Sequence, residues 1–220
     1  MTGDRWLDLL YLVPILLISL TIHEVAHGWI AYRMGDPTAK QKGRLSLNPI
    51  KQLDPVGTLL FVFTYLFWGV VFGWAKPVPI SPYYFRNVQR GMAIVGAAGP
   101  ISNFLMAVLF SVILRIVGPS LEEAGGSVAD VILRILFMFV MINIVLGVFN
   151  LIPIPPLDGS RVVGAFLPRQ AYQYWAALDR YGFLIIIIII VALQGQVGRM
   201  LSRVFGAIWD LIFIGTPYAG

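Results

Sequence analysis

Residues 7–32 read L-D-L-L-Y-L-V-P-I-L-L-I-S-L-T-I-H-E-V-A-H-G-W-I-A-Y, an almost unbroken apolar run. A helix needs about 20 such residues to cross the hydrocarbon core of a bilayer, so this run predicts a membrane-spanning helix. Towards its end stand His23, Glu24 and His27, and the chain has no other histidine. Each ionisable side chain costs on the order of 3 kcal/mol or more inside a membrane, so three together require a common explanation.

The composition of the whole chain agrees with a membrane protein. Of its 220 residues, 58% are hydrophobic and 12% are charged, and the mean hydropathy is +0.81, which is unusual for a soluble domain. The absence of cysteine excludes a disulfide, a thiolate nucleophile and a Cys-based metal site. The net charge of +5 comes from Lys and Arg in short loops between apolar runs, which is typical of membrane topology signals and not of a nucleic-acid-binding surface.

The apolar runs predict an all-α membrane protein, a polytopic bundle of about five to six transmembrane helices. The spanning candidates are residues 7–32, 92–117, 128–150 and 181–193, and shorter apolar runs cover residues 58–72 and 204–214. We expect a single domain over residues 1–220, with the core at about 7–165 and accessory C-terminal helices at about 166–215.

Charged residues in the loops predict the orientation of the bundle. The loop at residues 33–54 and the segment at residues 151–180 carry several Lys and Arg residues, so we expect both on the cytoplasmic side of the cell membrane. The connection at residues 118–127 has two glutamates but no Lys or Arg and is expected outside. An odd number of crossings must then separate these sides, so the run at 58–72 is predicted to be re-entrant or interfacial and covered by protein.

The segment H-E-V-A-H at residues 23–27 has the spacing of a metal site. Residues four apart share one face of a helix, so the imidazoles of His23 and His27 converge on one ion, and Glu24 can reach a water beside it. Zinc lowers the pKa of such a water to about 7, and a carboxylate can take its proton. The alternative is that all three are ordinary helix residues, which the apolar surroundings disfavour.

A catalytic zinc ion usually has three protein ligands, so the two histidines need a partner. Without another His or any Cys, that partner must be Asp or Glu. The segment N-L-I-P-I-P-P-L-D-G at residues 150–159 follows an apolar run, and its prolines break the backbone before Asp158. Asp158 combines this break, cytoplasmic-side depth and a following glycine, whereas every other acid lacks at least one of them. A proline-rich turn capped by Asp158 is the alternative.

The two motifs together resemble those of the site-2 protease family of intramembrane metalloproteases. Each motif lies on its own apolar segment, and they occur in the family's order. The stretch G-P-I-S-N at residues 99–103 is similar to the family's G-P-x-x-N element. The resemblance extends over about residues 15–165 and implies the fold and the chemistry of that family.

The resemblance also implies a role for each matched residue. One Zn²⁺ ion would be held by His23, His27 and Asp158, Glu24 would be the general base, and Asn150 would be a polar helper. The implied reaction is hydrolysis of peptide bonds within or near transmembrane segments of single-span membrane proteins. Many relatives carry PDZ or CBS domains, for which this chain has no room, so we expect a minimal catalytic core.

A proline-rich segment and one asparagine are further candidates for substrate binding. Residues 73–82, G-W-A-K-P-V-P-I-S-P, are expected to be extended, because proline disfavours helix in the preceding residue. Val78 and Ile80 would then lie on a β-like edge that pairs with an unwound substrate, although a plain connector fits equally well. Asn103, inside an apolar run, would contact either the substrate or a neighbouring helix.

Two other functions are compatible with the sequence. In a transporter, the same His, Glu and Asp side chains would bind a permeating metal ion or proton. The absence of a second, repeated set of broken helices in the sequence disfavours that function. An inactive membrane scaffold that keeps a metal site for stability is the third candidate. The lipid bilayer is an expected partner, nucleic acid is not, and the oligomeric state is left open.

Overall fold

The computed structural model describes residues 5–68, 73–182, 184–186, 188 and 195–214. The regular structure in these residues is helical, without a strand. Three of the helices are long and apolar enough to cross a membrane, namely α1 (Arg5–Arg33), α4 (Val88–Ala124) and α5 (Gly126–Asn150). The predicted class, an all-α membrane protein, is confirmed.

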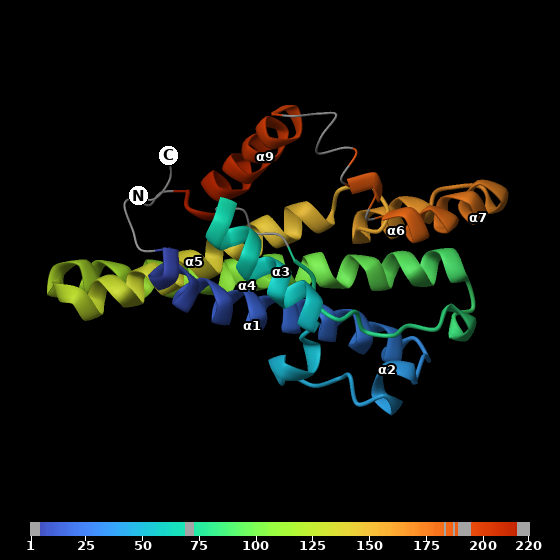
Figure 1. Ribbon diagram of the computed structural model, residues 1–220, viewed down its shortest axis with the longest axis horizontal. Helices are drawn as coiled ribbons and strands as arrows, with labels where there is room; N and C mark the ends of the chain where they lie inside the picture. Colours follow the sequence, from blue (N-terminus) through green and yellow to red (C-terminus); the bar gives the residue numbers. More distant parts are fainter. Residues whose placement is uncertain (1–4, 69–72, 183, 187, 189–194, 215–220) are drawn as a thin grey trace.

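Figure 1 shows α1, α4 and α5 extending side by side along the long axis of the molecule. α1 and α5 run in one direction and α4 in the other, so the end of α1, the start of α4 and the end of α5 lie together. We call this the site end, because α6 (Asp158–Gly164) follows α5 there. The interface of α4 and α5 is an apolar core that includes Ala107, Leu114, Leu136, Val140, Ile144 and Val148.

The connection between α4 and α5 is much shorter than the sequence suggests. The predicted loop at residues 118–127 is wrong, because α4 continues through Pro119 to Ala124 and α5 begins at Gly126. The turn depends on Gly125 and Gly126, whose φ angles of 60° and 85° lie in the left-handed region that favours glycine. With 37 residues, α4 is about 55 Å long and exceeds the roughly 30 Å hydrocarbon core.

The chain between α1 and α4 leaves and re-enters the bundle at the site end. It contains α2 (Thr38–Gln41), the 3-10 turn η1 (Pro49–Gln52), α3 (Pro55–Trp68) and the 3-10 turn η2 (Pro82–Tyr84). The chain after α3 returns to the turn that precedes α3. The backbone N–H of Lys76 there donates to the carbonyl of Gln52 at 2.9 Å. Close contact of Gly57 with Trp74 supports the same return path.

The predicted number of spanning helices stays a prediction. The described residues contain three helices suited to span a membrane, against the predicted five to six. The candidate at residues 181–193 falls largely outside the described residues, as do residues 69–72 of the run at 58–72. Within the described residues α3 extends over 14 positions, or about 21 Å.

Two groups of short helices complete the described chain. After α6 come α7 (Arg169–Ala177) and the 3-10 turn η3 (Leu178–Tyr181), and α9 (Gln196–Ile212) packs on α5. Phe213, at the end of α9, is fully buried in the core between α4 and α5. Arg115 of α4 donates to the carbonyls of Ile212 (3.0 Å) and Ile214 (2.6 Å). These contacts satisfy carbonyls that a helix end leaves unpaired.

We expect Phe213→Ala to lower the stability of the folded protein by about 3–5 kcal/mol, because the truncation leaves a cavity in a packed core. The measurement is thermal unfolding in detergent. The matched control is Leu211→Ala on the same helix, where the side chain is 72% exposed and the expected change is below about 0.5 kcal/mol. Equal unfolding temperatures for the two variants would show that Phe213 does not anchor α9.

Candidate metal centre

His23 and His27 lie one helical turn apart on α1. Each side chain is buried, with 4% exposure of the residue, and their Nε2 atoms are 3.0 Å apart. The two rings are nearly perpendicular, with an interplanar angle of 85°. The spacing of four residues thus brings both imidazoles to one face of the helix, as the sequence predicts.

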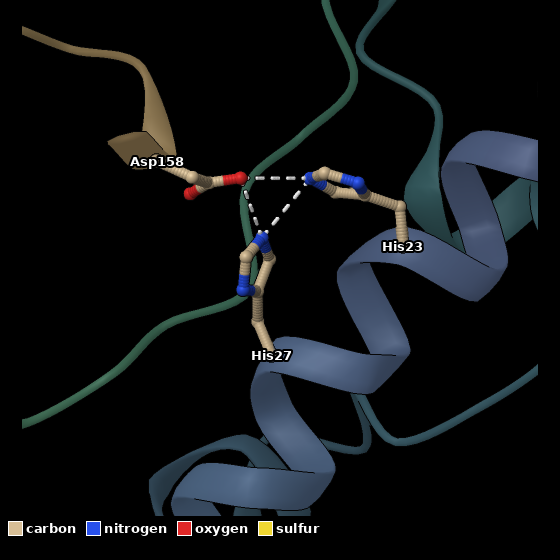
Figure 2. A group of neighbouring side chains, drawn as sticks. All are labelled: His23, His27 and Asp158. Atoms are coloured by element: carbon tan, nitrogen blue, oxygen red, sulfur yellow. Dashed lines mark hydrogen bonds and ion pairs between the residues drawn. The ribbon is translucent and has the colours of Figure 1, made fainter. Parts of the chain in front are cut away.

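Asp158 reaches both histidines from the start of α6, as Figure 2 shows. Its Oδ2 atom lies 3.1 Å from Nε2 of His23 and 3.1 Å from Nε2 of His27. Asp158 is itself buried, with 7% exposure. The structure therefore brings together the three residues that the sequence predicts as metal ligands, although Asp158 is more than 130 positions away from the histidines in the chain.

The backbone around Asp158 is shaped by prolines and one glycine. The prolines at positions 153, 155 and 156 lack N–H donors and prevent α5 from continuing. The chain then turns and α6 begins at Asp158. A Cβ at Gly159 would overlap the backbone of Leu151, so glycine lets the chain fold back closely enough to carry Asp158 to α1.

The other ring nitrogen of each histidine is hydrogen-bonded to α4. Nδ1 of His27 lies 2.7 Å from the carbonyl oxygen of Val95, and a carbonyl cannot donate, so this nitrogen carries the proton. Nδ1 of His23 lies 2.6 Å from Oδ1 of Asn103 and donates to it. A neutral imidazole that is protonated on Nδ1 has a lone pair on Nε2. Both Nε2 atoms and the carboxylate of Asp158 therefore direct lone pairs at one point.

These donors fit a zinc ion. Three acceptor atoms at 3.0–3.1 Å repel one another unless a metal cation or a shared proton lies between them. Ligand atoms around a tetrahedral zinc ion are roughly 3.3 Å apart when each bond is about 2.0–2.1 Å, which is close to these distances. Two imidazoles and one carboxylate leave the fourth position free, as in catalytic zinc sites. His23, His27 and Asp158 form the group of potential metal ligands found among the described residues.

The charges around the site also suit a divalent cation. Asp158 and Glu24 place two carboxyl groups at or beside the site. Nη1 of Arg161 lies 3.8 Å from the other carboxylate oxygen of Asp158, on the next turn of α6. This distance leaves Oδ2 as the oxygen that faces the histidines and the ion.

α4 approaches the histidines so closely that only glycine fits at position 99. A Cβ on Gly99 would lie 2.5 Å from Nε2 and 2.5 Å from Cε1 of His23, far inside van der Waals contact. Val95, Gly99 and Asn103 are each four residues apart and form one stripe of α4. The missing side chain at the centre of the stripe lets the groups on either side of it hydrogen-bond both imidazoles.

Glu24 lies beside the three ligand groups and is not one of them. It is half-buried, and its Oε2 accepts a hydrogen bond of 2.8 Å from the backbone N–H of Val78. The carboxylate is thus held between α1 and the extended segment that follows α3. It remains available to a water molecule next to the predicted ion.

The segment at residues 73–82 has no regular structure up to Ser81, so the predicted β-like edge is not a strand. Pro77 and Pro79 lack the N–H groups that a β-ladder needs. Val78 is buried and Ile80 is half-buried. The segment passes the site at Val78, but pairing with a substrate stays a prediction.

The extended segment is fixed to the loop after α1 at both of its ends. The carbonyl of Lys76 accepts from Nη2 of Arg44 at 2.6 Å. The backbone N–H of Ser81 donates to Oδ2 of Asp36 at 2.6 Å. Arg44 and Asp36 are both buried, so the segment is held by charged groups that are themselves enclosed by protein.

Two further predicted residues make hydrogen bonds within the helix bundle. Asn150 is the last residue of α5, and its amide donates to the carbonyl of Leu146 on the same helix at 3.0 Å. Asn103 is fully buried and contacts His23 and Asn143. These contacts favour the helix-packing alternative for Asn103. A catalytic role of Asn150 stays a prediction.

Several groups at the site were not predicted. They are Ser19, the carbonyl of Val95, and Asn143. A weak signal exists in the spacing, since Ser19 precedes His23 by four residues and Gly99 precedes Asn103 by four. Which helix faces which is absent from the sequence, so the partners of these residues could not be derived.

Comparison with known proteins gives the same chemistry. The profile of peptidase family M50 matches residues 114–193, which include Asp158. The chain is 36% identical to "Putative zinc metalloprotease YwhC" of Bacillus subtilis (strain 168) over 189 residues. These aligned residues cover 84% of this chain and 82% of that protein. The chain belongs to peptidase family M50. This M50 chain is also similar to "Putative zinc metalloprotease Rip2" of Mycolicibacterium smegmatis. The two are 30% identical over 179 residues, which cover 80% of this chain and 64% of Rip2. No solved structure matches this chain significantly.

Membership of M50 decides between the functions that the sequence left open. The chain is an integral membrane zinc metalloprotease, and none of these findings favours the transporter. The resemblance to site-2 proteases is confirmed by the family. Such a hydrolase requires a zinc site, and His23, His27 and Asp158 form a buried group that could hold the ion.

We expect Gly99→Ala to weaken zinc binding by at least about ten-fold, because the added Cβ displaces the ligand nitrogens of both histidines. Zinc affinity is measured by competition with a chromophoric chelator in detergent. Gly206→Ala in α9 is the matched control, because no atom lies within 4 Å of a Cβ at that position. Alanine favours helix over glycine at both positions, so a difference between the two variants reports the effect of the added Cβ at position 99. Wild-type zinc affinity in Gly99→Ala would contradict the close approach of α4.

Proposed function

We propose that this M50 peptidase hydrolyses peptide bonds within or near the transmembrane segments of single-span membrane proteins. The observation that carries the proposal is the convergence of the donor atoms of His23, His27 and Asp158, 3.0–3.1 Å apart, within a bundle of apolar helices. A peptide bond in the bilayer is accessible to a catalytic group that lies at membrane depth itself. The transmembrane segment of the substrate would bind against the same helix bundle.

The proposed mechanism assigns Nε2 of His23, Nε2 of His27 and Oδ2 of Asp158 as the zinc ligands. When bound, zinc supplies Lewis-acid chemistry that lowers the pKa of a water to about 7. Glu24 takes the proton of the attacking water and gives it to the amine of the leaving group. The half-buried position of Glu24, next to His23 and outside the ligand group, supports this role.

Substrate binding is proposed to involve the extended segment that contains Val78 and Ile80. The backbone N–H of Val78 is hydrogen-bonded to Glu24 at 2.8 Å, so the segment borders the catalytic carboxylate. An extended backbone at this place can offer hydrogen bonds to an unwound substrate, as in β-addition. Pro77 and Pro79 limit such pairing to the remaining N–H groups and the carbonyls.

The site is proposed to lie towards the cytoplasmic side of the plasma membrane. Loop charges support this orientation, because the site end of the bundle carries the basic residues Arg33, Arg86, Arg90, Arg161 and Arg169, and the far end carries Glu122 and Glu123. From His27 to Arg33 is six residues, or about 9 Å along a helix. Water would therefore need to reach only a shallow depth.

α3 and the extended segment together are proposed to form a re-entrant hairpin. Two observations support this. The backbone N–H of Lys76 donates to the carbonyl of Gln52, which brings the chain back beside the start of α3, and α3 extends over 14 described residues. Irregular backbone at membrane depth must be covered by protein, and Phe61 of α3 packs in a core with α1 and α5. We also propose that residues 7–165 form the catalytic core and residues 166–215 the accessory part.

Glu24→Gln is expected to abolish cleavage of a single-span reporter while zinc remains bound, because glutamine cannot accept the proton of the water. The test compares cleavage in detergent with zinc content after gel filtration. Glu123→Gln is the matched control, since Glu123 is exposed at the far end of α4. Loss of zinc in proportion to activity in Glu24→Gln would refute the assignment as a general base.

Asp158→Ala is expected to bind zinc at least about ten-fold more weakly and to lose hydrolysis, because two imidazoles alone hold the ion poorly. The measurement is zinc affinity by chelator competition, together with reporter cleavage. Asp210→Ala removes an exposed carboxylate of α9 and is the control. Full zinc occupancy in Asp158→Ala would overturn the assignment of the third ligand.

A further inference from the structure

A chain of buried polar side chains connects the zinc ligand His23 to α5. Asn103 Oδ1 lies 2.6 Å from Nδ1 of His23, and its Nδ2 donates to Oδ1 of Asn143 at 2.9 Å. Nδ2 of Asn143 donates to Oγ of Ser19 and to the carbonyl of Phe139, both at 2.9 Å. Ser19, Asn103 and Asn143 are each 0% exposed. We call these three residues the buried polar chain.

The direction of every hydrogen bond in the buried polar chain follows from one backbone group. The carbonyl of Phe139 can only accept, so the amide nitrogen of Asn143 must face it. Oδ1 of Asn143 then points at Asn103, which must present its own nitrogen. This turns Oδ1 of Asn103 towards His23, which must present a protonated Nδ1.

The consequence reaches the metal site. With its proton on Nδ1, a neutral His23 has a lone pair on Nε2, the atom that faces Asp158 and His27. If the side-chain amide of Asn103 rotated by 180°, its nitrogen would face Nδ1 of His23 and favour the tautomer protonated on Nε2. The Nε2 atom would then have no lone pair for a metal ion at the site. Asn103 alone allows either orientation, so the choice depends on Asn143.

The position of Asn143 favours a role beyond helix packing. It lies in α5 among apolar residues, where an unsatisfied amide would cost several kcal/mol. All three of its described hydrogen bonds are satisfied in the direction that gives His23 the metal-binding tautomer. An apolar residue would fill the same space between α1, α4 and α5 without this effect.

We propose that Asn143 is a positioning residue, which through Asn103 fixes the tautomer and ring orientation of His23 and so sets the affinity for zinc. The proposal rests on the proposed function, in which His23 is a zinc ligand. Partners that orient a ligating histidine typically contribute about ten- to hundred-fold in metal affinity. Asn143 touches neither the ion nor the substrate in this role.

The first measurement is the zinc affinity of Asn143→Leu, by chelator competition with the full chain in detergent, together with the absorption spectrum of Co²⁺ at the site. We expect an affinity about ten- to hundred-fold weaker and a changed Co²⁺ spectrum, because the geometry of His23 is no longer fixed. The control is Ser111→Ala in α4, which removes a buried hydroxyl that donates to Val108 on its own helix at 2.8 Å. We expect its affinity to change by less than about two-fold.

A double-mutant cycle separates positioning from general packing. Because Asn143 acts through Asn103, the variant Asn103→Leu/Asn143→Leu should bind zinc no more weakly than Asn103→Leu alone. Additive losses would show that Asn143 supports the bundle without orienting His23, and this outcome overturns the proposal. If Asn143→Leu does not fold, the same cycle with Asn143→Ser, which keeps a smaller polar side chain, carries the same expectation.

The same measurements distinguish this proposal from the proposed function. Zinc binding and a Co²⁺ spectrum like those of the wild type in Asn143→Leu would overturn the role of Asn143 and leave the metal ligands in place. Equal zinc binding by the wild type and His23→Ala would instead overturn the metal assignment itself. A weakened, spectrally altered site in Asn143→Leu, with no further loss in the double variant, supports the positioning role.

Discussion

The close approach of α4 to the histidines of α1 is the constraint on which the rest of the site depends. Gly99 leaves no room for a side chain against His23 and His27, and the helix groups one turn before and after it hydrogen-bond the two imidazoles. Because both Nδ1 atoms are occupied in this way, both Nε2 atoms face the same point. The close approach of the two helices thus places both imidazoles against hydrogen-bond partners on α4.

This arrangement also explains how polar groups are accommodated inside an apolar bundle. An isolated histidine or carboxylate at membrane depth is unfavourable, because the bilayer offers no partner. Here α1, α4, α5 and α6 each contribute a group, and the partners of His23 continue through Asn103 to Asn143. The cost of burial is offset only when all four helices are in place, so the metal site and the folded bundle depend on each other.

The contact of Glu24 with the extended segment connects catalysis to a different part of the chain. Its carboxylate accepts the backbone N–H of Val78, while the ends of the segment are fixed to Arg44 and Asp36. Prolines on both sides of Val78 leave it as the residue in that stretch with an N–H to donate. A substrate that pairs with this segment would therefore bind directly beside the carboxylate of Glu24, the proposed general base.

The sequence by itself determined the class of the protein and predicted the three proposed metal ligands, because both inferences depend on local rules. Apolar runs predict spanning helices, the i and i+4 spacing of His23 and His27 predicts a shared face, and prolines before Asp158 predict a broken backbone. The tertiary structure decided what depends on distant partners: the continuous α4–α5 hairpin, the fit of Gly99, and the link from His23 to Asn143. Contacts between helices are set by packing of whole surfaces, and no single stretch of sequence contains that information.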